Sequence, residues 1–409
     1  MKLFATRSLV FVFLAIGFTA PCALSQSYQV LYSFAGGRDG SSPSGWLTTD
    51  GSGNFFGVTA DGGAAQNCPS VYSFGCGTIF QFTPSGSESV VHRFNDGIGG
   101  GFPTTGLTLA PNGEYYGSAS QGSGASMGGV VYKFNPKTGQ TVNMYAFSGG
   151  SDGGGPNGVI AGSGGALYGV TTGGGNLTNP SCQLGGCGVV FEISGIGHEK
   201  VLHTFTGAPD GWSPKGSLVE DSQGNLYGTT NAGGVGTCNC GTIYKIDAEG
   251  NETILHSFSN SPDGALPTQG LMLDSQGNLY GATWSGGTSE NGTVFKLDTA
   301  GNLTILHSFS SADGANPSSS LISDSAGNFY GFTYGGGDLS CGFEGSGCGT
   351  VFRLDPSGRL TTIHSFTAEG SDGLEPYSGH LLLDAAGNLY GITTYGGSDA
   401  NGTVFEITR

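Results

Sequence analysis

Short apolar segments with alternating polar residues recur along almost the whole chain, and the clearest unit lies between residues 271 and 309. Its pattern predicts four strands, over residues 271–274, 279–283, 292–298 and 303–309. Glycine-containing turns separate the first strand from the second and the third from the fourth, which favours antiparallel pairing. Four short antiparallel strands in about 50 residues are typical of one blade of a β-propeller.

Two aromatic markers indicate that this unit occurs seven times. An aromatic residue followed by glycine stands in each predicted second strand, at Phe56, Tyr116, Tyr168, Tyr227, Tyr280, Tyr330 and Tyr390. A phenylalanine ends each predicted fourth strand, at Phe34, Phe94, Phe147, Phe205, Phe258, Phe309 and Phe366. The repeat is longer than that of a β-solenoid, and a sandwich would not repeat its sequence. We therefore predict an all-β fold, a seven-bladed β-propeller with four antiparallel strands per blade.

The two ends of the chain complement each other. Residues 28–34 match only a fourth strand, whereas residues 402–408 match a third strand with no fourth strand after it. We expect the N-terminal strand to pair into the last blade, because a ring closed in this way leaves no open edge. The expected domain is a single propeller over residues 26–409.

Residues 1–25 have the features of a secretory signal peptide. Lys2 and Arg7 precede an apolar segment over residues 9–18, and small residues stand before an expected cleavage site near Gln26. No second apolar segment is long enough to span a membrane. The mature protein is therefore expected to be exported, to the periplasm or the extracellular space.

The negative net charge of the chain makes binding to polyanionic partners unfavourable. Glycine supplies 80 of 409 residues and charged residues only 11%, well below the usual quarter or so. Removal of residues 1–25 removes two basic residues and no acidic one, so the net charge changes from −17 to −19. Such a surface disfavours nucleic acid and anionic membranes, since both require Lys and Arg.

An Asp-Gly pair stands in the predicted connection before each blade, and six of the seven pairs read Asp-Gly-x-x-Pro. The aspartates are Asp39, Asp96, Asp152, Asp210, Asp263, Asp313 and Asp372. A ring of carboxylates on the rim with the variable loops is a candidate ligand-binding feature for Ca²⁺ or polar sugars. The alternative is that each Asp caps its own turn through a backbone N–H. The spacing is not that of an EF-hand.

Histidine occupies one repeat position in five units, at His92, His203, His256, His307 and His364, and Tyr32 and Tyr145 take this position in the other two. A position filled by His or Tyr favours an aromatic ring with a polar tip, which is a packing requirement. No serine-hydrolase elbow and no other catalytic set is present. We therefore predict no catalytic residues and no cofactor other than Ca²⁺, and leave the identity of any metal open.

Eight cysteines follow the signal peptide, in four loops between second and third strands. In an oxidising compartment, local disulfides are the default. We expect Cys68 to bond with Cys76, Cys182 with Cys187, and Cys341 with Cys348. Cys238 and Cys240 are only two residues apart, at the limit of disulfide reach, and their pairing stays open.

The elements Gly-Thr-Val-Phe, His-Ser-Phe, Asp-Gly-x-x-Pro and Gly-Asn-Leu-Tyr-Gly recur throughout the mature chain. This repeat resembles the GloVer tandem-repeat family of bacterial secreted proteins, and the resemblance implies no defined activity. Less closely, the strand pattern is similar to NHL-type and streptogramin-lyase-type propellers. We expect a monomeric binding module that holds a glycan, peptide or protein on its loop rim. The alternatives are a propeller-type lyase or lactone hydrolase with a metal or an acid–base pair at the central opening, and an adhesive scaffold.

Overall fold

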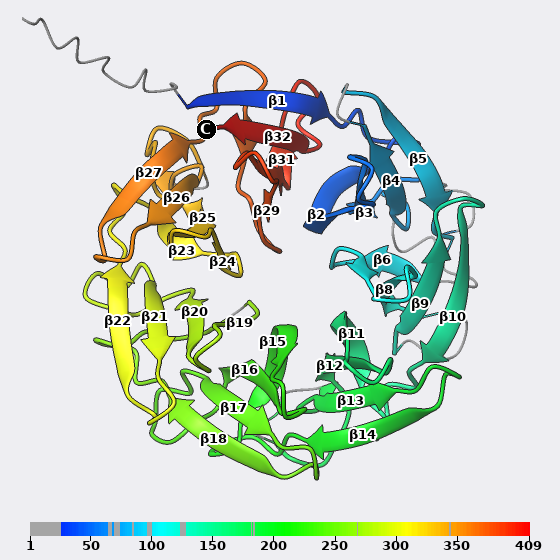
Figure 1. The fold of residues 1–409 in the computed structure, drawn as a ribbon, viewed down its shortest axis with the longest axis vertical. Coiled ribbons are helices and arrows are strands. Elements are labelled where there is room, and N and C mark those ends of the chain that lie inside the picture. Colours follow the sequence, from blue (N-terminus) through cyan, green and yellow to red (C-terminus); the bar gives the residue numbers. More distant parts are fainter. Residues whose placement is uncertain are drawn as a thin grey trace, which may run out of the picture.

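The computed structural model describes residues 26–409 except 64–67, 69–73, 84–85, 96–99, 123–127, 181, 183–184, 268 and 343–344. The predicted signal peptide and Asp96 lie outside the described residues. Figure 1 shows strands arranged as radial sheets around a central opening, with the chain running once around the ring. Within the described ranges, no helix is long and apolar enough to cross a membrane.

Seven blades make up the described part of the chain, which confirms the predicted fold class. Blade 1 contains β2 (Ser41–Thr49), β3 (Phe55–Asp61), β4 (Thr78–Phe82) and β5 (Glu88–Arg93). Blade 2 contains β6 (Gly101–Pro103), β7 (Thr108–Leu109), β8 (Tyr115–Gln121), β9 (Val130–Asn135) and β10 (Gln140–Ala146). Blade 3 contains β11 (Gly154–Ala161), β12 (Leu167–Gly173), β13 (Val189–Ile193) and β14 (Glu199–Thr204). Blade 4 contains β15 (Trp212–Glu220), β16 (Leu226–Ala232), β17 (Thr242–Ile246) and β18 (Glu252–Ser257).

Blades 5 to 7 follow the same order. Blade 5 contains β19 (Met272–Leu273), β20 (Leu279–Thr283), β21 (Thr293–Leu297) and β22 (Leu303–Ser308). Blade 6 contains β23 (Ala315–Pro317), β24 (Ile322–Ser323), β25 (Phe329–Gly335), β26 (Thr350–Leu354) and β27 (Leu360–Ser365). Blade 7 contains β28 (Gly373–Leu374), β29 (Leu382–Leu383), β30 (Leu389–Thr393), β31 (Tyr395–Gly396), β32 (Thr403–Thr408) and β1 (Ser27–Ser33).

The innermost strand differs from the sequence prediction in blade 1. β2 begins directly after the Asp39-Gly40 pair, so the residues expected to form a connecting loop already pair with β3, Ser41 with Asp61 and Pro43 with Thr59. The register then shifts between Ser44 and Thr48. A bulge of this kind allows one strand to contain both the Asp-Gly-x-x-Pro segment and the following apolar segment.

The aromatic-glycine marker is explained by packing inside each blade. A side chain at Gly281 would place its Cβ 2.7 Å from Cζ of Phe295 on the neighbouring strand β21, so only glycine leaves room for this ring. Phe258, at the end of the outer strand of blade 4, packs on Phe295 with ring centroids 5.3 Å apart. Both phenylalanines are buried. The glycine of the second strand thus makes room for the ring of the third strand, and the phenylalanine that ends the fourth strand of the preceding blade packs on that same ring. Both sequence markers therefore belong to one contact between adjacent blades.

The two ends of the chain meet in blade 7, where β1 pairs antiparallel with β32 from Ser27↔Thr408 to Ser33↔Thr403 (Figure 1). Tyr28 stacks on His364 of blade 6, with ring centroids 3.6 Å apart. At the boundary between the last blade and the first, a Cβ on Gly402 would lie 2.3 Å from Cδ of Pro43. Gly292 of blade 5 approaches Pro317 of blade 6 in the same way, with 2.6 Å between the same two positions.

Candidate functional site

The loops between second and third strands contain the disulfides. Bonds join Cys68 to Cys76, Cys182 to Cys187, Cys238 to Cys240 and Cys341 to Cys348, with Cα–Cα distances of 5.8, 4.9, 5.2 and 5.6 Å. The three predicted pairs are thus present, and the pair that the sequence left open is bonded as well. Each bond joins two cysteines of the same loop, so no disulfide links one blade to another.

Six of the seven predicted aspartates are described, and each binds within its own turn. Each carboxylate accepts a hydrogen bond of 2.7–3.0 Å from a backbone N–H at the start of the turn, those of Ala35, Ser148, Thr206, Ser259, Ser310 and Thr367. This is the geometry of an Asp that caps its turn. Binding of an external ligand by these carboxylates stays a prediction.

The same carboxylates also form hydrogen bonds with the His or Tyr side chain at the repeat position described above. The ring nitrogen or hydroxyl lies 2.9–3.3 Å from the carboxylate in the pairs Tyr32–Asp39, Tyr145–Asp152, His203–Asp210, His256–Asp263, His307–Asp313 and His364–Asp372. His92 differs, since its Nδ1 atom lies 2.9 Å from the carbonyl oxygen of Gly139. The sequence interpretation treated Asp and His/Tyr separately, although their nearly constant spacing of six to eight residues could have linked them.

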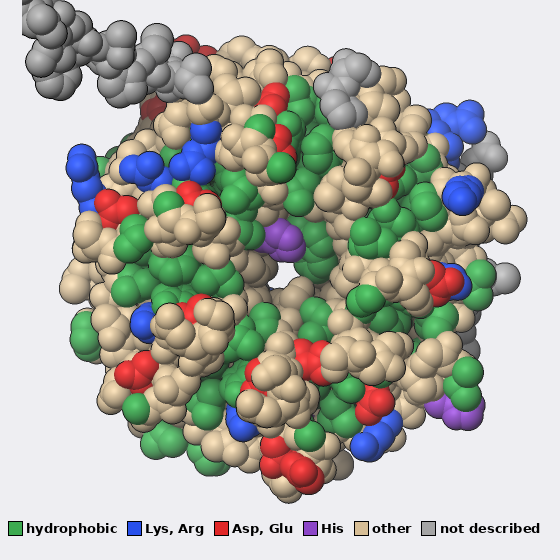
Figure 2. All heavy atoms as spheres, viewed as in Figure 1, with side chains coloured by type: hydrophobic (Ala, Val, Ile, Leu, Met, Phe, Trp, Pro, Cys, Tyr) green, Lys and Arg blue, Asp and Glu red, His purple; other side chains and the backbone are tan. Residues whose placement is uncertain are grey.

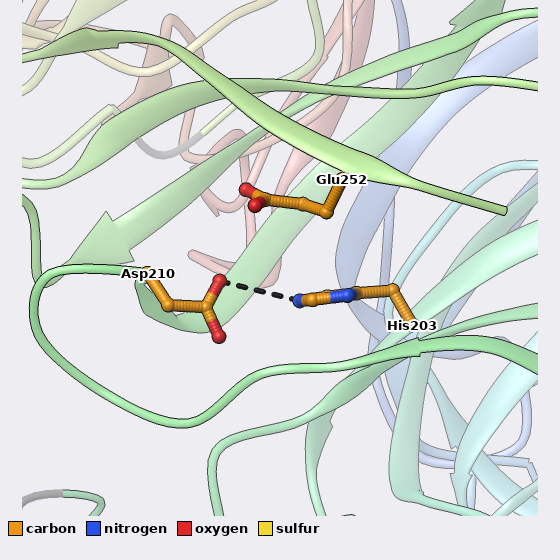
Figure 3. Close-up of side chains that lie close together, drawn as sticks. All are labelled: His203, Asp210 and Glu252. Carbon is orange, nitrogen blue, oxygen red and sulfur yellow. Dashed lines mark hydrogen bonds and ion pairs between the residues drawn. The ribbon is translucent and has the colours of Figure 1, made fainter.

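At one blade boundary a third ligating group joins the pair (Figure 3). His203 is the second-last residue of β14 and Asp210 lies in the connection after this strand, whereas Glu252 begins β18 of the next blade. The ligating atoms of the three side chains lie within 4.8 Å of one another, and in the described residues this is the only such group of three or more His, Cys, Asp or Glu. All three side chains are partly buried. None of the other five described aspartates of the predicted ring belongs to such a group.

Glutamates stand beside two tyrosine pairs at equivalent positions. Burial, followed by repulsion from Asp39, raises the pKa of Glu88 to about 7. Burial and Asp152 likewise raise the pKa of Glu199. A carboxyl group next to another carboxylate in a partly buried site favours its neutral form. Each of these two boundaries therefore places a second carboxyl group beside an aspartate in a partly buried site, where the neutral form of the glutamate is favoured.

The centre of the ring contains a cavity of about 490 Å³. All seven blades contribute to its wall, with Trp46, Thr105, Asn157, Ser217, Gln269, Ser320 and Tyr377 representing blades 1 to 7 in order. Figure 2 shows the central opening on one face of the molecule, with hydrophobic side chains around it. The volume lies in the range of ordinary small-molecule sites.

Aromatic rings lie at two places on the cavity wall. Trp46 donates a hydrogen bond of 3.0 Å from Nε1 to the carbonyl oxygen of Leu107, and its ring stacks on His380 with centroids 5.1 Å apart. Trp284 lies 5.4 Å from Tyr334 and 6.1 Å from Tyr377, measured between ring centroids. The Tyr377 side chain is 54% exposed. These contacts fix the orientation of the rings before any ligand arrives.

The rest of the wall is polar and nearly uncharged. Ser, Thr, Asn and Gln side chains predominate, and among the described lining residues Lys215 is the only one with a charged side chain. Burial lowers the pKa of Lys215. Burial also lowers the pKa of His380, which lies next to Trp46, to about 4. His380 is therefore neutral near pH 7. No Asp, Glu or His stands among these described lining residues, so they supply no acid–base pair of carboxylates or imidazoles.

Comparison with known proteins identifies the repeat. The model of the Gloeobacter/Verrucomicrobia repeat matches residues 21–182, 67–273, 179–343 and 236–409, so the matches cover nearly all of the chain. No curated protein matches the chain by sequence.

Solved structures match the fold at low identity. One is the extracellular domain assigned to a hybrid two-component system from Bacteroides thetaiotaomicron, with a TM-score of 0.57 and 12% identity over 93% of this chain. This chain spans 41% of that structure. Another is oligogalacturonate lyase from Vibrio parahaemolyticus, with a TM-score of 0.57, 10% identity and 93% coverage of both chains. At such identities the similarity establishes the propeller fold alone.

Proposed function

The chain belongs to the Gloeobacter/Verrucomicrobia repeat family, and we propose that it is an exported propeller that binds a neutral oligosaccharide in its central cavity. The observation that carries this proposal is the cavity wall, in which Trp46, Trp284 and Tyr377 stand among neutral Ser, Thr, Asn and Gln side chains. Aromatic rings offer an apolar face to the C–H groups of a sugar ring. The neutral polar groups then bind the hydroxyls.

The charge of the wall favours sugars over other ligands. An anionic ligand would need several cationic partners, but Lys215 is the only charged side chain among the described lining residues. A polar ligand without charge leaves no buried ion unpaired, and hydroxyl groups can both donate and accept hydrogen bonds. The wall thus supports binding, and it gives no support to the alternative of a lyase or lactone hydrolase, which would need an acid–base pair or a metal there.

Other features support an extracytoplasmic location. Four disulfide bonds require an oxidising compartment to form and persist. This agrees with the expected signal peptide over residues 1–25 and a single propeller domain over residues 26–409. We propose the periplasm or the cell exterior, and a monomer as the functional unit.

The test is a glycan-array screen of the mature protein, followed by calorimetric titration of the oligosaccharides that bind. Replacement of an aromatic wall residue, Trp46→Ala or Tyr377→Ala, should weaken binding about tenfold or more, since each ring contributes roughly 1 kcal/mol or more. Thermal melting of each variant monitors folding separately, and Tyr377→Ala should leave it nearly unchanged because Tyr377 is exposed.

Ile196→Ala is the matched control. Ile196 is 81% exposed and lies in the turn between the third and fourth strands of blade 3, away from the second-to-third-strand loops. It should bind glycans as the wild type does. Equal binding by Tyr377→Ala and the wild type, or binding of charged ligands in preference to neutral oligosaccharides, would contradict the proposal.

A further inference from the structure

We propose that His203, Asp210 and Glu252 form a binding site for one divalent transition-metal ion, such as Zn²⁺, at the boundary between blades 3 and 4. The site is separate from the central cavity and does not depend on the proposed glycan binding. It combines one imidazole with two carboxylates, a ligand set that suits zinc and its neighbours in the first transition series rather than Ca²⁺.

The distances suit a small ion. The Nε2 atom of His203 lies 3.2 Å from Oδ1 of Asp210, close to the separation of about 3.3 Å between two ligands on a tetrahedral ion with bonds of about 2.0 Å. The ligating atoms of all three residues lie within 4.8 Å of one another. Figure 3 shows the three side chains converging from three separate segments.

The two oxygen atoms of Asp210 have different roles. Oδ2 accepts the backbone N–H of Thr206 at 2.7 Å and its hydroxyl at 2.9 Å, as in the other turns of this type. Oδ1 lies 3.2 Å from Nε2 of His203. Asp210 can therefore bind an ion through Oδ1 while it still caps its turn through Oδ2.

An unsatisfied carboxylate oxygen stands beside the imidazole at this boundary. The Oε1 atom of Glu252 is buried and has no hydrogen-bond partner among the described residues, as is also the case for Oε1 of Glu88 and Glu199 at the two tyrosine boundaries, and only at Glu252 is an imidazole the neighbouring ligand. A buried carboxylate oxygen without a partner, next to the second carboxylate of Asp210, is costly for the fold. A bound divalent cation would neutralise both carboxylates and give Oε1 a partner.

The other blade boundaries provide internal comparisons. Tyr32–Asp39 with Glu88, and Tyr145–Asp152 with Glu199, have both carboxylates but a phenol in place of the imidazole. His256–Asp263 has the imidazole and the aspartate, but Leu303 begins β22 where Glu252 begins β18. Within the described residues, the full set thus occurs at one boundary, which predicts one ion per chain.

The experiment is calorimetric titration of the chelator-treated mature protein with ZnCl₂, with thermal melting in parallel. The wild type should bind one Zn²⁺ and melt at a higher temperature with zinc, because the ion binds the folded state. His203→Tyr removes the imidazole but places at this position the residue that blades use at Tyr32 and Tyr145, so the turn should persist. Glu252→Leu places at β18 the residue found at β22. Each variant should weaken zinc binding about tenfold or more.

His256→Tyr is the matched control, because it makes the same substitution at a pair that lacks the third ligand. It should bind zinc as the wild type does. The proposal is overturned if the wild type gives no saturable zinc binding, if His203→Tyr binds as tightly as the wild type, or if His256→Tyr loses binding to the same extent. Tighter binding of CaCl₂ than of ZnCl₂ in the same titration would also overturn it.

Discussion

The Nε2 atom of His256 lies 2.9 Å from Oδ2 of Asp263, while Oδ1 accepts the backbone N–H of Ser259 at 3.0 Å. One carboxylate thus joins the outer strand β18 to the turn that leads into blade 5. The same relationship, with His or Tyr as the ring, occurs in all six described units of the predicted aspartate ring.

Two replacements of Asp263 should show whether this residue stabilises the fold by capping its turn through a hydrogen bond or through its negative charge. Asp263→Ala leaves the Ser259 N–H and the His256 ring without a partner, so we expect the free energy of unfolding to fall by about 2 kcal/mol. Asp263→Asn keeps an acceptor for the N–H and should lose less than half of that amount. Urea unfolding of the three proteins checks this, and an Asn variant as unstable as the Ala variant would contradict the capping role.

The raised pKa of Glu88 predicts a pH dependence of stability. Glu88 faces Asp39, Tyr32 and Arg93, and burial with the Asp39 carboxylate raises its pKa from 4.5 to about 7. The folded state therefore binds a proton that the unfolded state has released between these pH values, and this contribution to stability is lost as pH rises through about 7.

Glu88→Gln keeps this position neutral at every pH. At pH 8 it should be more stable than the wild type by about 1 kcal/mol, a value reduced for partial solvent screening, and the difference should vanish near pH 4.5. Melting temperatures from pH 4.5 to 8 measure the effect. Glu249→Gln, at an exposed turn position, is the control and should follow the wild type. A Glu88→Gln profile parallel to the wild type would count against the prediction.

The disulfides should stabilise their own loops only modestly. Cys341 and Cys348 are buried against the core between blades 6 and 7, and their bond closes a short loop. Replacing both by Ser should lower the free energy of unfolding by about 2–3 kcal/mol. The Cys238–Cys240 pair closes a still shorter loop and should contribute less. Peptide mapping under non-reducing conditions checks the pairing, which bonds between different loops would disprove.

Pairing of β1 with β32 should be essential for the ring. Deletion of residues 27–33 leaves β32 as an unpaired edge, and we expect a large loss of stability and aggregation visible by size-exclusion chromatography. Tyr28→Ala removes the stacking on His364 and should cost about 2 kcal/mol. Gln29→Ala, at an exposed position of the same strand, should cost about 0.5 kcal/mol or less. A monomeric deletion variant with unchanged melting would refute the prediction.

Much of the fold could be predicted because each blade repeats the same local pattern. β20 has the bounds predicted for it, residues 279–283, and β22 lacks only the terminal Phe309 of its prediction. The start of β2 was missed, since an Asp-Gly pair followed three residues later by proline resembles a turn in sequence. The bulge that makes it a strand depends on its pairing with β3.

The sites were harder to predict because they combine different repeat positions. Trp46 lies in an inner strand, Trp284 directly follows a second strand, and Tyr377 lies in a connection before an inner strand. Only closure of the ring brings them to one cavity. Glu252 approaches His203 for a similar reason, since the contact crosses a blade boundary that no local pattern describes.

The junction of β1 with β32 also affects how the protein is made. β1 pairs with a strand that is synthesised about 370 residues later, so no nascent chain that stops before residue 403 can supply the partner of β1. Blades 1 to 6 can form their hairpins during synthesis, because contacts within each blade are local. Translation errors that truncate the chain, or proteases that remove its C-terminal strand, therefore leave β1 unpaired. The result is an open ring whose strand edge can pair with other chains, and not a closed propeller with fewer blades.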